Sequence, residues 1–245
     1  AEPKLVIDAT LHWEKGTTGN QQIIRLSEST GFYNQEFPKA KNAIVWIVAT
    51  TTNQIFQFSE ITDGVYNCNS FVPNLNETYL LHIEYKNEIF EGTEKINPTP
   101  LISDISQDNE GGFTGDLIEV TASFQDNINE DNYYLISWKN NELKEEFEVS
   151  NDEFFNGNTI KTSYASSDED EELKPGSALN IRLSSISKNS FNFISKIFSS
   201  ANTGNPFASP IGAIRGNVKN ITNPEKYPLG YFNILETHSQ NYIVQ

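Results

Sequence analysis

Apolar and polar side chains alternate along the first part of the chain, with the period of two that is typical of half-buried β-strands. In residues 78–85, for example, Tyr79, Leu81, Ile83 and Tyr85 share one face. Such segments predict about seven strands before residue 97, at 4–11, 21–29, 43–50, 53–60, after the Asp63-Gly64 hairpin turn, 78–85 and 87–96. Short strands separated by frequent turns are typical of an immunoglobulin-like β-sandwich.

A stiff link follows these strands, because residues 97–103 read "NPTPLIS" and each proline fixes φ and removes a hydrogen-bond donor. Strand patterns then resume, which predicts a first domain at 1–97 and a second β-rich domain at 101–245. The second domain is expected to contain strands at 116–126, 132–140, 143–149, 178–187, 212–220 and 228–236.

One segment of the second domain has a helical period instead. Phe191, Ile194 and Phe198 are spaced by three and four residues, which predicts a helix at about 187–201. Ser187 is placed to cap its start, and Gly204 suits its C-terminal end. The predicted fold class is therefore mainly β, with a single substantial helix.

Charge excludes some partners. The chain has 245 residues and a formal net charge of −16, with 17 basic and 33 acidic residues. A chain this acidic is unsuited to nucleic acid or to an anionic membrane surface, because both attract clusters of Lys and Arg. No stretch approaches the roughly 20 apolar residues of a transmembrane helix.

Cysteine and methionine usage add two expectations. Cys68 is the only cysteine, so no disulfide forms within the chain, and its place in a predicted strand favours a buried, inert thiol. Methionine is absent, even at position 1. We therefore expect the native protein to have lost a signal segment, or the ends to have been trimmed.

No catalytic or metal-binding constellation is evident. His12, His82 and His238 lack metal-ligand spacing, and no G-x-S-x-G, H-E-x-x-H or P-loop motif occurs. The acidic run 168–172 lacks the turn residues that gather oxygen ligands around calcium, and the run 126–131 has no EF-hand register, which favours solvated loops for both. We predict no catalytic residue, no metal and no cofactor, and leave the ligand-binding residues open.

Two of the three tryptophans lie inside strong strand patterns. This favours core packing for Trp46 and Trp138, whereas Trp13 follows the first strand and is a candidate for exposure. A similar question concerns Gly216, which lies between apolar residues in the predicted strand 212–220 and suggests close packing on a buried face. The neighbouring Arg215 is expected to pair with a carboxylate.

Several segments together resemble one family. They are "PKLVIDATL", "AIVWIV" followed by "FQFSEITDGVYN", "TYLLHIEY", and above all "GNPFASPIGAIRGNVKN" with "LGYFNI". In this order and spacing the chain is similar, over nearly its whole length, to the domain of unknown function 4249 family of Bacteroidota.

The resemblance implies a fold and a setting. It implies a first domain like an immunoglobulin-like or carboxypeptidase-regulatory sandwich, in secreted lipoproteins of the outer membrane. Genes of the family commonly lie beside TonB-dependent, starch-utilisation-type transporters. We therefore expect a lipid-anchored protein at the extracellular face that serves a β-barrel transporter in nutrient uptake. The lipid-bearing cysteine of the family is missing from this chain, and the family offers no catalytic residue to carry over.

Two other functions stay open. One is a structural or adhesive cell-surface protein that acts without a transporter. The other is a hydrolase with an unrecognised site, which the missing nucleophile and metal motifs disfavour. Neither the cargo nor the partner's identity is encoded in a motif.

Overall fold

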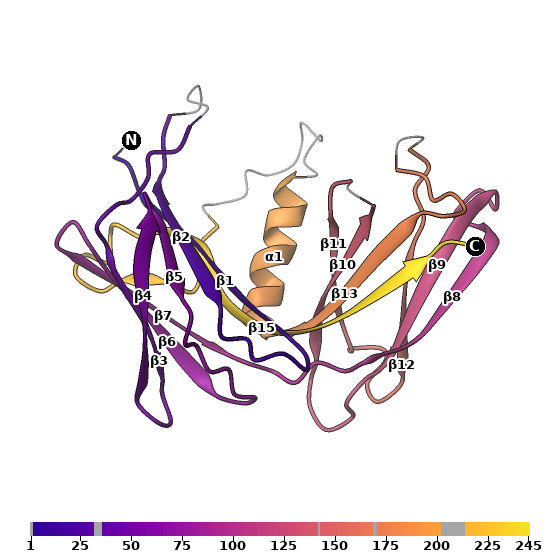
Figure 1. Ribbon diagram of the computed structural model, residues 1–245, viewed down its shortest axis with the longest axis horizontal. Helices are drawn as coiled ribbons and strands as arrows, with labels where there is room; N and C mark the ends of the chain where they lie inside the picture. The colour runs from indigo at the N-terminus through magenta and orange to yellow at the C-terminus, as the bar shows by residue number, and fades with distance from the viewer. Residues whose placement is uncertain (1, 32–35, 142, 169–170, 202–213) are drawn as a thin grey trace. The chain divides into compact units, whose positions relative to one another are not determined.

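The computed structural model describes the chain except residues 1, 32–35, 142, 169–170 and 202–213. The described part contains fifteen strands and one helix (Figure 1), which confirms the mainly β fold class. The chain forms two compact units. The first comprises Ala1–Asn97 and Asn192–Leu235, and the second comprises Pro98–Phe191 and Glu236–Gln245.

This division differs from the predicted domains 1–97 and 101–245, because residues 192–235 group with the first unit. The reason lies in the long strand β15 (Leu229–Ile243), whose first part lies beside β1 (Leu5–Glu14) and whose last part pairs with a strand of the second unit. One continuous strand therefore contributes to both units, which a division by position in the sequence does not foresee.

The strands of the first unit are neighbours in the order β15-β1-β2-β5-β4-β3-β6-β7-β14. From β1 to β14 each pair of neighbours is antiparallel. Its remaining strands are β2 (Gln22–Glu28), β3 (Ile44–Ala49), β4 (Gln54–Thr62), β5 (Val65–Cys68), β6 (Thr78–Tyr85), β7 (Glu88–Lys95) and β14 (Lys219–Asn220). Gly64, at a φ of +70°, closes the predicted hairpin between β4 and β5. The first half of β4 pairs with β3 and its second half with β5, so this strand turns the corner of the unit.

The core of the first unit follows the predicted alternation. Tyr79, Leu81 and Ile83 are fully buried, as is Cys68, whose thiol is free. They pack with inward residues of the facing strands, among them Leu11, Ile24, Ile47, Phe56 and Phe232.

The second unit contains two antiparallel sheets, in the orders β12-β9-β8 and β11-β10-β13-β15. Their strands are β8 (Ile102–Gly111), β9 (Leu117–Gln125), β10 (Tyr133–Asn140), β11 (Glu146–Asn151), β12 (Thr159–Tyr164) and β13 (Ala178–Ile186). Phe124, Tyr134 and Trp138 lie in its core, so the prediction for Trp138 is confirmed. Strand β12 was not predicted, because only its Ile160 and Tyr164 are buried and its sequence, TIKTSY, is otherwise polar.

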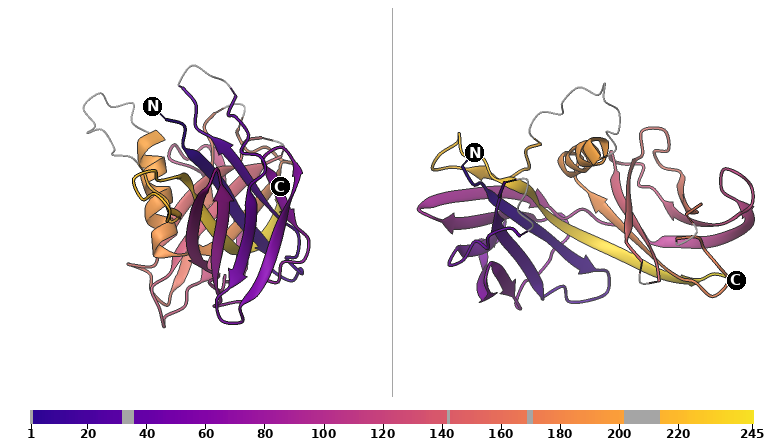
Figure 2. Two further views of the ribbon diagram at one scale, coloured as in Figure 1. Left: turned by 90° about the vertical axis from the view of Figure 1, so that its left-hand side faces the viewer. Right: turned by 90° about the horizontal axis from the view of Figure 1, so that it is seen from above.

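The helix α1 (Lys188–Ala201) begins where the sequence predicts. It is the orange coil in Figure 2. The Ser187 hydroxyl oxygen accepts a hydrogen bond from the Ser190 backbone N–H at 3.1 Å, which is N-terminal capping. The predicted stop at Gly204 lies outside the described residues. No helix in the described part of the chain is long and apolar enough to cross a membrane.

The predicted strand 212–220 is mostly wrong. Residues up to 213 lie outside the described part, and only Lys219–Asn220 of the remainder form a strand. The reason is a crossing of backbones. A Cβ placed on Gly216 would lie 1.8 Å from the Gly230 carbonyl oxygen, so this segment passes directly over β15. Instead of backbone-to-backbone hydrogen bonds, the Asn217 side chain connects this segment to β15. It accepts a hydrogen bond from the Phe232 N–H and donates one to the Phe232 carbonyl.

Candidate ligand-binding pocket

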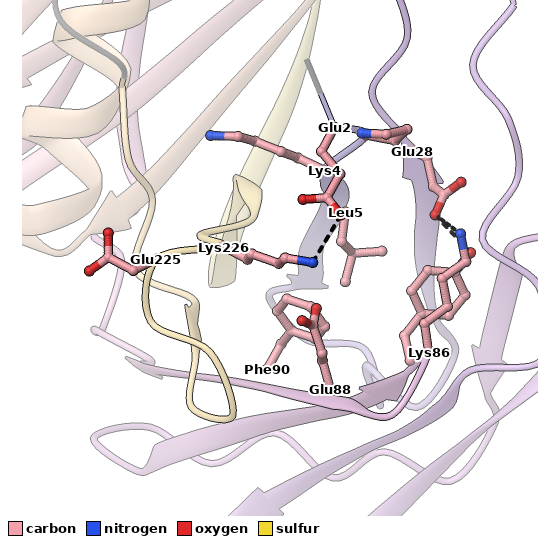
Figure 3. A pocket seen from close by; sticks show the side chains of 11 residues that line it. Glu2, Lys4, Leu5, Glu28, Lys86, Glu88, Phe90, Glu225 and Lys226 are labelled. Carbon is pink, nitrogen blue, oxygen red and sulfur yellow. Dashed lines mark hydrogen bonds and ion pairs between the residues drawn. The ribbon is translucent and has the colours of Figure 1, made fainter.

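The first unit contains a pocket of about 390 Å³ (Figure 3). Segments far apart in the sequence supply its lining: the chain before and at the start of β1, the end of β2, the β6–β7 turn and the loop before β15. The side chains are Glu2, Pro3, Lys4, Leu5, Glu28, Tyr85, Lys86, Glu88, Phe90, Glu225 and Lys226. Buried Leu5 and Phe90 form an apolar part, and charged groups of both signs surround it.

The β6–β7 turn places one side of the pocket. Lys86 and Asn87 have φ values of 50° and 62°, the left-handed pair that a two-residue hairpin of type I′ requires. Tyr85 and Glu88 are consequently paired directly across the turn. Asparagine suits this conformation because its short polar side chain tolerates positive φ.

Glu28 gathers two groups from this turn. Its carboxylate forms an ion pair with Lys86 and accepts a hydrogen bond from the Tyr85 hydroxyl at 3.2 Å. The hydrogen bond to Glu28 raises the pKa of Lys86 above its ordinary value. Burial, followed by the Glu28 charge, raises the pKa of Tyr85.

Asn220 fixes the opposite side. This buried side chain donates hydrogen bonds to the Glu88 carboxylate and the Lys226 carbonyl, both at 3.1 Å. Its oxygen accepts from the backbone N–H groups of Thr222 and Asn223, which closes the loop before β15. The Lys226 ammonium then reaches Glu2 at 3.0 Å. That contact raises the pKa of Lys226.

A third group reaches the pocket through Lys4, the one of its three residues that lines it. The Lys4 ammonium nitrogen is 3.1 Å from the ring centroid of Tyr227, and the Arg215 guanidinium carbon is 4.2 Å from the same centroid. Arg215 therefore contacts an aromatic ring, and the expected pairing with a carboxylate is not found among the described residues. Interaction with Lys4, aided by the Arg215 charge, lowers the pKa of Tyr227 below its ordinary value.

Trp46 and His82 form a second feature, on the outer face of β3 and β6. Their rings are stacked with centroids 3.9 Å apart, and His82 Nδ1 lies 2.7 Å from a Glu91 carboxylate oxygen. The predicted core position of Trp46 is thus wrong. Its neighbours Val45 and Ile47 point into the core, so alternation directs Trp46 outward, where it is half-buried.

The other residues singled out from the sequence lie apart from the pocket. Trp13 is half-buried and donates through its ring N–H to the Thr17 carbonyl at 2.9 Å. His238 accepts a hydrogen bond from the Ile102 backbone N–H. The acidic run 168–172 is described only in part, and the described residues contain no group of three or more His, Cys, Asp or Glu side chains suited to a metal.

Sequence reasoning missed the pocket because no motif contains it. Its members come from short segments that only the folded sheet brings together. The local features that could have indicated the pocket were the β6–β7 turn and Arg215, which has no other charged residue directly beside it in the sequence.

Comparison with known proteins gives a family and distant structural similarities. A family model described as Domain of unknown function (DUF4249) matches residues 1–241. No curated protein matches the chain.

Among solved structures, a DUF4785 family protein from Legionella pneumophila has 11% sequence identity and a TM-score of 0.28 over 74% of this chain and 51% of that chain. The FN1–FN3 domains of chicken CNTN1 have 11% identity and a TM-score of 0.26, over 75% and 61%. A two-domain fibronectin type III segment of chicken tenascin has 13% identity and a TM-score of 0.23, over 75% and 90%. The chain thus spans about half of the first of these proteins.

Proposed function

The chain belongs to the family described as Domain of unknown function (DUF4249), and from this premise we propose that it is a non-catalytic binding subunit of a TonB-dependent uptake complex. In this proposal the protein is held by a lipid at the extracellular face of the outer membrane. It presents a ligand to a β-barrel transporter, or retains the ligand near it.

The pocket is the observation that carries the proposal. A volume of about 390 Å³ falls in the range of small-molecule sites, which typically combine apolar lining with a few placed polar groups. Here Leu5 and Phe90 supply the apolar part. Glu28 and Asn220 hold the charged groups in fixed positions before any ligand arrives. Such preorganisation reduces the entropic cost of binding.

A separate surface in the second unit supports the part of the proposal in which the chain binds a protein partner. Ile128, Phe154 and Phe155 lie on two loops and are 68%, 82% and 50% exposed. The loops are joined because Asp126 accepts a hydrogen bond from the Gly157 backbone N–H at 2.8 Å. Apolar side chains gathered at an exposed tip are typical of interaction sites. We call these three residues the apolar tip.

The proposal is tested in the native organism. The tagged full-length protein is recovered from gently solubilised outer membranes, and the proteins that remain bound are identified. We expect a β-barrel transporter in stoichiometric amounts, and slower growth of a deletion strain on the nutrient that this transporter imports. Recovery of the protein alone, with normal growth on every nutrient tried, would instead favour a free-standing structural or adhesive surface protein.

A further inference from the structure

Two cations converge on Tyr227 in a chain that is otherwise strongly acidic. Lys4 comes from the segment before β1, Arg215 from the segment that crosses β15, and both lie against the same phenol ring. Among the described residues, no carboxylate lies within ion-pair distance of either cation. This is unexpected for a chain with 33 acidic and 17 basic residues, in which a partner for an exposed cation is easily supplied.

The arrangement has an electrostatic cost. The ring face attracts each cation, typically by about 0.5–1 kcal/mol at an exposed site. The two cations also repel each other, and their positive charge is not neutralised locally. The positive field also acts on the phenol, because Lys4 and Arg215 together lower the pKa of Tyr227.

A bound anion would neutralise the positive charge of Lys4 and Arg215. An oxyanion beside the ring would attract both cations and accept hydrogen bonds from the ammonium, the guanidinium and the phenol O–H, and charge-assisted hydrogen bonds of this kind are the strong ones. Guanidinium also matches the flat geometry of carboxylate and phosphate groups. We propose that Lys4, Arg215 and Tyr227 bind the oxyanion of a small molecule, a carboxylate or phosphate group, whose remainder occupies the pocket.

The other pocket cations support this orientation. Lys86 is paired with Glu28 and Lys226 with Glu2, whereas Lys4 lines the pocket without a carboxylate partner among the described residues. The negatively charged end of a ligand therefore meets the least neutralised cation at Lys4. This inference rests on the proposed function, because it assigns the chemical class of the ligand that the pocket takes.

The first test measures binding to the full chain by titration calorimetry. The probes are inorganic phosphate, glucuronate and, as a neutral reference, glucose. Phosphate and glucuronate distinguish a phosphate-bearing from a carboxylate-bearing ligand. We expect at least one of them to bind and glucose to bind at least about tenfold more weakly, since one charged hydrogen bond accounts for that factor.

Matched variants separate the site from the general charge. Lys4→Gln and Arg215→Gln should each weaken binding of the anion about tenfold or more. Lys95→Gln and Arg25→Gln remove the same charge from exposed strand positions of the first unit and should change it less than about threefold, as expected for screened surface charges. Arg215→Lys should retain part of the affinity. Equal losses in all four Gln variants, or no anion binding by the wild type, would overturn the proposal.

A spectroscopic readout does not depend on the stability of those variants. The ultraviolet titration of wild-type protein minus that of Tyr227→Phe reports ionisation of Tyr227. Saturating anion should raise the pKa of Tyr227, because it neutralises the cations that lower it. An unchanged titration under saturating anion would contradict the site.

The outcomes also separate this inference from the proposed function. Anion binding without any co-purifying transporter would leave the site intact and remove the uptake role. A transporter that co-purifies with a protein that binds neither phosphate nor glucuronate would leave the uptake role intact and remove the oxyanion site.

Discussion

At the scale of single residues, two backbone contacts explain why glycines occupy the crossing at β15. Gly216 lies against the carbonyl oxygen of Gly230, and a Cβ on Gly230 would lie 1.9 Å from the carbonyl oxygen of Ile7. At both glycines the backbone of another segment therefore occupies the place that a Cβ would take. Because the contacting atoms are backbone atoms, a larger side chain cannot be accommodated by a rotamer change.

We expect Gly216→Val to destabilise the protein by about 1–3 kcal/mol, the usual cost of overpacking. Urea denaturation measures the change in the free energy of unfolding. Gly31→Val is the matched control, because Gly31 has no heavy atom within 4 Å of its added Cβ and no positive φ. Equal stabilities of the two variants would show that the crossing is loose.

Glu148 makes the second unit sensitive to pH. Its side chain on β11 accepts a hydrogen bond from the Thr162 hydroxyl, and burial raises its pKa, an effect that the indole of Trp138 partly offsets. The folded state thus retains this proton at a higher pH than the unfolded chain does. The contribution of Glu148 to stability is largest below its unfolded pKa of about 4.3, and falls as the pH rises through the raised folded value.

Glu148→Gln keeps the hydrogen-bond acceptor and removes the charge. The variant should melt at a higher temperature than wild type at pH 7, and the difference should shrink toward pH 4. Glu153→Gln removes an equal charge at an exposed position and should lack this pH-dependent gain. Thermal melts between pH 4 and pH 7 measure this difference in melting temperature. A difference that does not depend on pH would contradict a raised pKa for Glu148.

At the scale of elements, Asn217 connects the segment before β14 to β15. Its side chain bonds the Phe232 N–H at 2.9 Å and the Phe232 carbonyl at 2.8 Å. Asn217→Ala leaves both backbone groups without these partners, which should cost about 1–3 kcal/mol. Hydrogen exchange of the Phe232 amide should accelerate in this variant and stay unchanged in Asn223→Ala. Unchanged protection of the Phe232 amide in Asn217→Ala would show that other groups hold this segment against β15.

The same element shows what the sequence could predict. Strands such as β6 and β9 follow from periodicity, because their local pattern agrees with their burial, and the start of α1 follows from the Ser187 cap. The segment around Gly216 was predicted as a strand because its apolar residues alternate, but its hydrogen bonds go through a side chain instead. The pocket could not be predicted, since its geometry arises from pairing between distant strands and from the Asn220 loop.

At the scale of the whole molecule, the proposed complex requires a docking surface on the chain. The apolar tip is the candidate, and the topology provides its control. Ile128 follows strand β9, whereas the exposed Phe113 precedes it, so the two lie beyond opposite ends of one strand.

Phe154→Ser with Phe155→Ser should reduce the transporter recovered with the tagged protein at least about tenfold, because exposed aromatic side chains commonly anchor interfaces. Phe113→Ser should leave recovery unchanged, and all variants should melt like wild type because these side chains are exposed. Undiminished recovery with the double variant would show that the transporter binds another surface. The same loss in both would indicate that recovery depends on general surface hydrophobicity and not on a specific docking site.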